Sequence, residues 1–515
     1  MTFSKKHLYY IGAALLLGII FLCSYLLWPK PVRVALVNMP DFIASRMAVA
    51  ADKKNVRLAA VTELTELKNY DAMIAFGMGL KWTDEDRTLI KQLGEERGLK
   101  YLAYMTTTPE NNISNLDSLQ QKTLESYLAN GGTSNYRSAF NYIRKEVLGK
   151  SLRTGTIEEP IEYGYDLLFT DEDPDLAFDS VESFQKFYNE HGYKEGAPRI
   201  ALFTGIAGPF GSSRDYLDEL IGALEESGFN VYPISAMTRR LEFLSEIKPQ
   251  AVIYFAHGRF GGDPAIAWLK EHNVPIFSPL IVSEEYSDWL QDKQGMWGGY
   301  LSQTVVTPEI DGAIHPFALV TLRENKQGFK EFHTIPERLP DFCSLLHRYV
   351  KLQTMSNADK RIALFYFKGP GQNSLVAQGI EVVPSLYNVL KYLQSQGYDL
   401  TGLPDTEEAF AKDLMSRGAL YNNYAEGNKQ LLLSSNYPAF VSTQELTQWI
   451  DDTFPPALKD SIEGHYGAIP GHDLVEGIAV TRLTYGKVAL LPQPGSGSGE
   501  LDFKMVHGST SVPAY

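Results

Sequence analysis

The chain has 515 residues and a formal net charge of −15 at pH 7, and 44% of its residues are hydrophobic. This length is too great for one hydrophobic core, so roughly three or four domains are expected. The acidic balance and the lack of a long Lys/Arg run argue against a nucleic-acid partner.

The first predicted element is a membrane-spanning helix over Leu8 to Trp28, "LYYIGAALLLGIIFLCSYLLW". It has no charged residue and meets the length of about 20 residues that a bilayer span requires, with aromatic residues at both ends. A cleaved signal peptide is the alternative, but no A-x-A-like site follows. We therefore expect residues 1–30 to form a short cytoplasmic head and a single-pass anchor. The flanking basic residues nearly balance, but the seven-residue head carries two lysines and favours an N-terminus inside the cell, so the body is expected outside the cytoplasm, with a cytoplasmic body as the open alternative.

The two cysteines lie in different environments, and the chain contains no CxxC, H-x-x-x-H or HExxH pattern. Cys23 falls in the apolar N-terminal segment and Cys343 in a helical pattern. A structural disulfide and a zinc site of the usual spacing are therefore not expected. The metal-binding residues, if any, stay unknown at this stage.

Residues 31–110 are predicted to form a first α/β module. Helical patterns separate apolar runs that are typical of buried strands, and these runs cover residues 31–39, 56–61, 70–79 and 100–106. Residues 111–197 are mostly polar and helical without a clear strand rhythm, so they are interpreted as a helical connecting region.

Two further α/β modules are predicted over residues 198–355 and 356–515, because both open with the same five residues. "RIALF" begins at Arg199 and again at Arg361, and each following helix ends at a glycine followed by an aromatic residue. Continuous apolar runs of this kind are typical of parallel strands buried on both faces. The fold class is therefore α/β, with several Rossmann-like parallel-sheet modules.

A glycine-rich stretch, "KGPGQNSLVAQGIE", follows the second of these strands. A nucleotide-binding loop is the first interpretation, but a Walker loop needs Gly-Lys-Ser/Thr, which is missing here. Only Gly369 and Gly371 have the spacing of a dinucleotide fingerprint. The sequence therefore predicts no ATP site. The glycines turn the chain at the carboxyl edge of a sheet, where open α/β sheets bind ligands.

The helix after this loop resembles one in the large subunit of cobaltochelatase and magnesium chelatase. That family has roughly "YLNVFESLYNLLKRLKEEGYDV", and this chain has "IEVVPSLYNVLKYLQSQGYDL" over residues 380–400. "YGKVALLPQP" at residues 485–494 is also similar to a family motif, "GNVFIGPQP". The resemblance covers about residues 198–515, and it implies that the third module is truncated at its C-terminus. Glu381 and Pro384 depart from the family pattern, where Asn and Glu are usual.

The resemblance implies a protein that binds a tetrapyrrole, either haem or a cobalamin precursor, and the predicted anchor would attach it to a membrane. The protein would either insert cobalt into the tetrapyrrole or remove iron from haem. If the body is cytoplasmic, separate ATPase chelatase subunits would be its partners. Membrane-anchored relatives are associated with haem uptake. A metal chelatase or haem dechelatase is thus the first hypothesis, and a non-catalytic tetrapyrrole-binding module for uptake is the alternative.

Candidate site residues come from two glycine-rich loops that follow apolar strands. His257 and Arg259 lie in "YFAHGRFGGDP" and Glu381 follows the second loop. His257 and Glu381 could exchange protons or touch the metal, and Arg259 suits the carboxylates of the macrocycle. Gly369 and Gly371 would let backbone lie close to a flat ring. The alternatives are a solvated loop histidine, and a first-turn acid favoured by the helix dipole.

Overall fold

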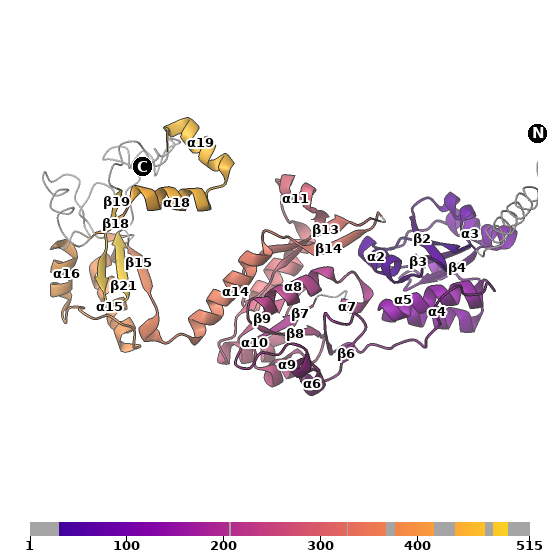
Figure 1. The fold of residues 1–515 in the computed structure, drawn as a ribbon, viewed down its shortest axis with the longest axis horizontal. Helices are drawn as coiled ribbons and strands as arrows, with labels where there is room; N and C mark the ends of the chain where they lie inside the picture. The colour runs from indigo at the N-terminus through magenta and orange to yellow at the C-terminus, as the bar shows by residue number, and fades with distance from the viewer. Residues whose placement is uncertain are drawn as a thin grey trace, which may run out of the picture. The chain divides into compact units, whose positions relative to one another are not determined.

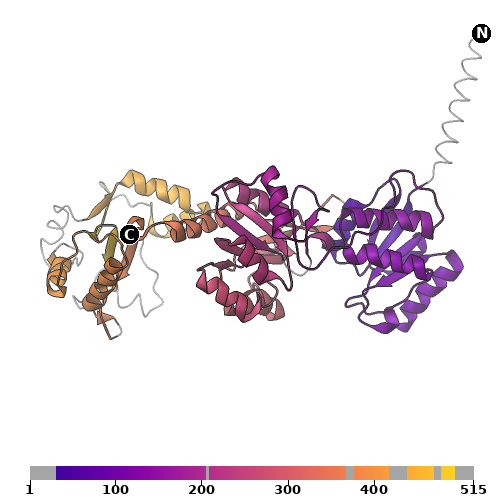
Figure 2. The same ribbon diagram turned by 90° about the horizontal axis from the view of Figure 1, so that it is seen from below.

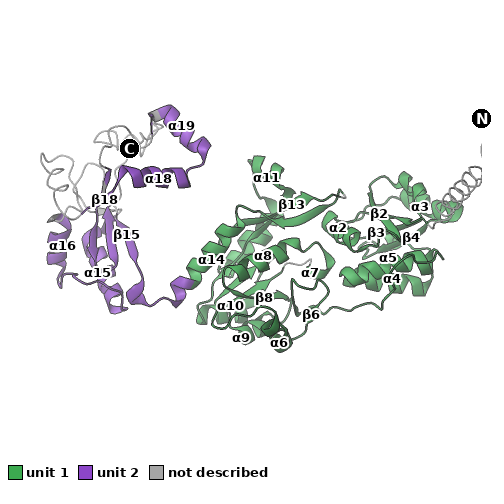
Figure 3. Ribbon diagram, viewed as in Figure 1, with its two compact units in different colours: residues 1–350 green, residues 351–515 purple. Residues whose placement is uncertain are grey.

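The computed structural model describes residues 30–204, 208–326, 328–366, 376–377, 379–416, 438–468 and 477–492. The chain divides into two compact units, residues 1–350 and 351–515 (Figure 3). Within the described ranges, no helix has the length and hydropathy that a membrane span requires. The predicted span over Leu8 to Trp28 lies outside these ranges.

The first module of unit 1 is built on a parallel four-stranded sheet in the order β2-β1-β3-β4 (Figure 1). Every neighbouring pair runs parallel, and the two inner strands are almost wholly buried. The four strands coincide with the four apolar runs in the sequence: β1 (Val32–Val37), β2 (Val56–Val61), β3 (Ala72–Phe76) and β4 (Lys100–Tyr104).

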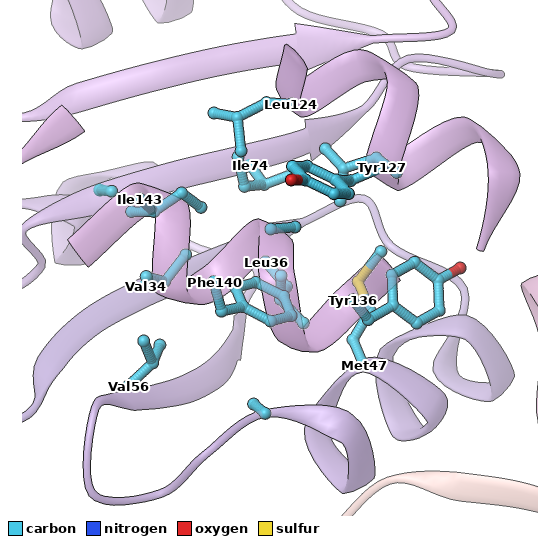
Figure 4. Close-up of a cluster of buried hydrophobic side chains, with 14 of the residues drawn as sticks. Val34, Leu36, Met47, Val56, Ile74, Leu124, Tyr127, Tyr136, Phe140 and Ile143 are labelled. Atoms are coloured by element: carbon cyan, nitrogen blue, oxygen red, sulfur yellow. The ribbon is translucent and has the colours of Figure 1, made fainter. Parts of the chain in front are cut away.

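Helices cover both faces of this first sheet. One face carries α2 (Asp41–Ala50), α4 (Ser118–Asn130) and α5 (Thr133–Tyr142), and the other carries α3 (Asp84–Arg97). Thr83 caps α3 with a reciprocal capping box. Figure 4 shows how α2, α4 and α5 pack on the sheet through a shared apolar cluster, which includes Val34, Leu36, Met47, Val56, Ile74, Leu124, Tyr127, Tyr136, Phe140 and Ile143.

The second module of unit 1 contains a seven-stranded sheet in the order β12-β10-β9-β7-β8-β5-β6. Its central strand, β7 (Arg199–Phe203), is buried from Ile200 onward, which confirms the prediction for the first "RIALF" segment. Five strands are parallel: β7, β8 (Asn230–Ser235), β9 (Ala251–Tyr254), β10 (Ile276–Phe277) and β12 (Ala313–Ile314). The sheet is nonetheless mixed, because β5 (Leu167–Phe169) and β6 (Ala177–Phe178) add an antiparallel edge.

Two helical layers enclose the seven-stranded sheet (Figure 2). On one face lie α8 (Asp215–Glu226) and α14 (Leu339–Thr354). On the other lie α6 (Val181–His191), α9 (Arg240–Ile247) and α10 (Gly262–Glu271). A small sheet packs beside α8, and it consists of β11 (Leu280–Glu285), β13 (Ala318–Glu324) and β14 (Lys330–Thr334). The shorter elements of both modules, and the first one of unit 2, are η1 (Leu64–Asn69), η2 (Pro109–Asn111), η3 (Ile143–Val147), α7 (Gly208–Gly211), α11 (Tyr286–Gln291), α12 (Gly298–Leu301), η4 (Ser302–Val306), α13 (Thr307–Ile310) and η5 (Asn357–Asp359).

The region predicted as a helical connection, residues 111–197, is not a separate part of the structure. Helices α4 and α5 belong to the core of the first module, whereas β5, β6 and α6 belong to the second module. An amphipathic helix shows in its sequence that one face is buried, but not which sheet buries it. The domain boundary therefore lies inside the predicted connection.

The turn between α4 and α5 joins the two modules of unit 1. Gly131 has φ 68°, and a Cβ there would lie 2.8 Å from the carbonyl oxygen of Phe210, so a side chain is excluded. The N–H of Gly132 donates to the same oxygen at 2.8 Å. Asp175, from the second module, accepts from the backbone N–H groups of Thr133 and Ser134 at 2.6 and 2.9 Å. A carboxylate of one module thus caps a helix of the other.

Unit 2 contains a three-stranded sheet in the order β15-β21-β20, with β15 (Ile362–Tyr366) parallel to β21 (Val488–Pro492) and β20 (Leu483–Tyr485) antiparallel. The prediction of a central buried strand for the second "RIALF" is wrong, because β15 is at the edge of the described sheet and the Phe365 side chain is 69% exposed. The remaining elements are β16 (Val376–Ala377), β17 (Ile380–Glu381), α15 (Val382–Ser395), α16 (Glu407–Ser416), β18 (Ala439–Val441), α18 (Thr443–Thr453), α19 (Pro456–Tyr466) and β19 (Ile478–Val480).

We expect Phe140→Ala to loosen the first sheet, because Phe140 is fully buried in the cluster that α5 shares with that sheet. Truncating a buried Phe costs about 3–5 kcal/mol. Hydrogen exchange measured by mass spectrometry should therefore become faster in peptides that cover β1. Lys122→Ala on the exposed face of α4 is the control. Unchanged exchange in β1 would mean that these helices do not support the sheet.

Candidate functional site

The carboxyl edge of the seven-stranded sheet contains a topological switch point. Strands β7 and β9 are neighbours, but the chain leaves β7 for α8 on one face and leaves β9 for α10 on the other face. The two loops therefore diverge, and open α/β sheets bind ligands in the crevice that forms outside such strand ends. The predicted residues His257 and Arg259 lie in the loop that follows β9.

The loop after β9 has a fixed shape because a buried carboxylate holds it. Arg259 Nε donates to Asp311 Oδ1 in an ion pair, and the N–H of Phe260 donates to Asp311 Oδ2 at 2.6 Å. Gly258 has φ 91° and its N–H donates to the carbonyl of Gln303 at 2.8 Å. The Arg259 side chain remains 45% exposed. Part of its guanidinium can therefore still meet an anionic ligand, and His257, two residues before it, is also exposed.

A cavity of about 380 Å³ opens beside this loop, at the carboxyl end of β10. Thr304, next to the Gln303 that holds the loop, lines it. So do His315 and Tyr349, whose Nε2 and hydroxyl oxygen lie 2.7 Å apart. His315 has φ 53°, a left-handed conformation in which histidine is enriched. Neither His315 nor Tyr349 belongs to a recognisable motif, so the sequence alone does not reveal them.

The loop after β7 reaches this edge from the joint between the two modules. Phe210 and Gly211 lie against the α4–α5 turn, and Tyr136 donates its hydroxyl proton to the Gly211 carbonyl at 3.0 Å. The N–H of Ser213 donates to the Phe42 carbonyl at 2.8 Å. The first module therefore fixes the position of the loop after β7, on one side of the switch point. Interfaces between domains are common positions for ligand sites.

The remaining predicted site residues belong to unit 2 or lie outside the described residues. Glu381 is exposed and directly precedes α15, where its side chain makes no capping hydrogen bond. Gly369 and Gly371 fall within residues 367–375, which are outside the described ranges. That these two glycines let backbone lie close to a flat ring stays a prediction.

One group of side chains in the described residues has the composition of a metal site. Asp215, at the start of α8, and Glu331 and His333, on β14, bring three ligand atoms within 4.8 Å of one another. This group is not recognisable in the sequence, because more than a hundred positions separate Asp215 from β14. The alternation Glu-Phe-His at 331–333, which puts both ligands on one face of a strand, was its only local signal.

Parts of this chain are similar in sequence to curated proteins, and its fold is similar to a solved structure. The chain is 26% identical over 254 residues to the magnesium-chelatase subunit ChlH of Oryza sativa subsp. japonica, covering 48% of this chain and 17% of that protein. It is 23% identical over 320 residues to the aerobic cobaltochelatase subunit CobN of Pseudomonas aeruginosa, covering 59% and 25%. The chain thus spans a quarter or less of the length of these two relatives.

The fold matches the catalytic subunit of cobaltochelatase from Mycobacterium tuberculosis, with a TM-score of 0.66 and 20% identity, over 93% of this chain and 40% of that one. This likeness supports the α/β architecture of parallel-sheet modules. The model of the CobN/Magnesium Chelatase family matches residues 125–515, which include both unit 2 and the switch point of unit 1. The chain is a member of the CobN/magnesium chelatase family.

Proposed function

We propose that this chain holds a tetrapyrrole while the central metal of the macrocycle is inserted or removed, as part of a chelatase large subunit. The observation that carries this proposal is the family match over residues 125–515. Two of the relatives are named as subunits of cobaltochelatase and magnesium chelatase. The proposal therefore includes partner subunits, among them an ATPase if the body is cytoplasmic.

The switch-point edge supplies the groups that such a substrate needs. The half-exposed Arg259 guanidinium can bind a carboxylate of the macrocycle in a bidentate way. His257 and His315 offer imidazole nitrogens that can carry a proton to or from a pyrrole nitrogen, or contact the metal. Independently of this edge, Glu381 in unit 2 is proposed as a proton carrier because it directly precedes the helix that resembles the chelatase family. The substrate metal is cobalt in the insertion reaction and iron if haem is the substrate.

We expect His257→Ala and Arg259→Ala to weaken tetrapyrrole binding by about tenfold each, because one lost polar or charge-assisted contact costs about 1.4 kcal/mol or more. The measurement is a titration of the full-length protein with haem and with a cobalt-free corrin, followed by absorbance. Glu381→Gln should reduce metal transfer more than affinity, because its role is proton exchange.

Arg348→Ala is the matched control for this titration, since Arg348 lines a different hollow of unit 1, between α8 and α14. If Arg348→Ala weakens binding while His257→Ala and Arg259→Ala do not, the tetrapyrrole lies in that hollow and the proposed edge is wrong. Free protoporphyrin fluorescence after incubation with haem and a reductant would identify iron removal. Binding without any metal transfer, with partner subunits present, would favour the non-catalytic uptake module.

We expect Asp311→Ala to loosen the His257 loop and to weaken tetrapyrrole binding indirectly. The change leaves the buried N–H of Phe260 unpaired, which costs about 1–3 kcal/mol. Hydrogen exchange in peptides covering residues 255–261 should rise. Asp263→Ala removes a fully exposed carboxylate 3.8 Å from Arg259 and should leave both readouts unchanged. Equal effects of the two substitutions would show that Asp311 does not hold the loop.

We further propose that Leu8 to Trp28 anchors the protein in a membrane, on the basis of 21 successive uncharged residues. Full-length protein should stay with membranes after an alkaline carbonate wash, and a version that begins at residue 30 should be released. Mass spectrometry that finds a mature N-terminus near residue 30 would show a cleaved signal peptide instead.

A further inference from the structure

Three potential metal ligands converge where α8 meets β14. Glu331 and His333 are two positions apart on β14, so their side chains lie on the same face of the strand. Asp215 is the first residue of α8. His333 Nε2 lies 3.5 Å from Glu331 Oε2. Metal–ligand bonds of about 2.0–2.2 Å place neighbouring ligand atoms about 3–4 Å apart, so this pair already has the required spacing.

Other residues orient two of these ligands through their second atoms. His333 Nδ1 lies 2.9 Å from Glu219 Oε1, and the N–H of Thr334 donates to the other Glu219 oxygen at 2.7 Å. When Nδ1–H donates to Glu219, the neutral ring carries its lone pair on Nε2, which faces Glu331. Metal-bound histidines commonly have such a carboxylate partner on the other ring nitrogen.

Glu331 is oriented in the same way as His333. Its Oε1 accepts from Asn325 Nδ2 at 2.7 Å and from the hydroxyl of Ser45, a residue of the first module. Its other oxygen, Oε2, is left facing the histidine. Both β14 ligands therefore present one free ligand atom each to the same point, beside Asp215.

Three carboxylates, those of Asp215, Glu219 and Glu331, surround His333. Asp215 forms no ion pair within 4.0 Å in the described part of the chain. The nearby Arg46 leaves its buried Nε and Nη2 without a hydrogen-bond partner there. The ligand atoms of Asp215 and Glu331 lie within 4.8 Å of one another, so their two carboxylates repel each other when both are ionised. A cation between the carboxylates would remove this repulsion.

We propose that Asp215, Glu331 and His333 bind a divalent first-row transition-metal ion. One imidazole nitrogen with two carboxylate oxygens suits Co²⁺, Fe²⁺ or Zn²⁺, whereas Mg²⁺ and Ca²⁺ prefer oxygen ligands alone. Asp215 is exposed, so an ion can reach the ligands from solvent on that side. The proposal concerns metal binding by this chain alone and does not rest on the proposed chelatase function.

The test is a titration of metal-free full-length protein with Co²⁺ alone, followed by the visible absorption of the bound ion and by calorimetry. We expect one bound Co²⁺ per chain. His333→Ala and Glu331→Gln should weaken binding by at least about 100-fold, and Glu219→Gln, which removes only the orienting partner, by about 10–100-fold. Asp215→Asn, on an exposed helix start that cannot disturb the core, should weaken it by at least about tenfold.

His191→Ala is the matched control, because His191 lies 3.8 Å from a single carboxylate, that of Glu172, and is outside the three-ligand group. This variant should bind Co²⁺ as the unsubstituted protein does. The proposal is overturned if the unsubstituted protein binds no Co²⁺, or if Asp215→Asn and His333→Ala bind it with unchanged affinity. Tetrapyrrole titration of Asp215→Asn should be normal, so failure of this site and failure of the proposed function give different results.

Discussion

The close backbone contact between the α4–α5 turn and the loop after β7 governs the arrangement of unit 1. Gly131 lies so near Phe210 that no side chain fits between them, and Asp175 completes the contact by capping α5 across the joint. Because the loop after β7 leads directly into α8, this contact also positions the start of α8. The wall of the switch point and the position of Asp215 beside β14 both follow from it.

The sequence predicted the local elements better than their surroundings. Two identical "RIALF" segments both form strands, but only the first is buried on both faces, because helical layers cover both sides of β7. In unit 2, Phe365 is exposed on the face of β15 opposite the described helix cluster. The helices that cover a sheet come from distant parts of the chain, so the sequence of a strand does not show whether both of its faces are buried. The same limit explains why α4 and α5 were assigned to a connection rather than to the first core.

The candidate site was predictable where it follows strand ends and unpredictable where it depends on tertiary contact. His257 and Arg259 stand out in the sequence because a glycine-rich loop follows an apolar strand. Asp311, which fixes that loop, lies 52 positions from Arg259 and looks like an ordinary turn residue. His315 and the three metal ligands likewise carry no motif. Contacts between distant residues depend on how sheets and helices pack, and local sequence patterns do not predict that packing.

The cap that Asp175 provides has a consequence for the order of events during protein synthesis. Thr133 and Asp175 are 42 positions apart, and at 5–20 residues per second the ribosome needs about 2–8 seconds to make that length of chain. Until then, the first turn of α5 has only water for its free N–H groups. The first turn of α5 therefore gains its cap only when the second module begins to form, after the rest of the first module has been made.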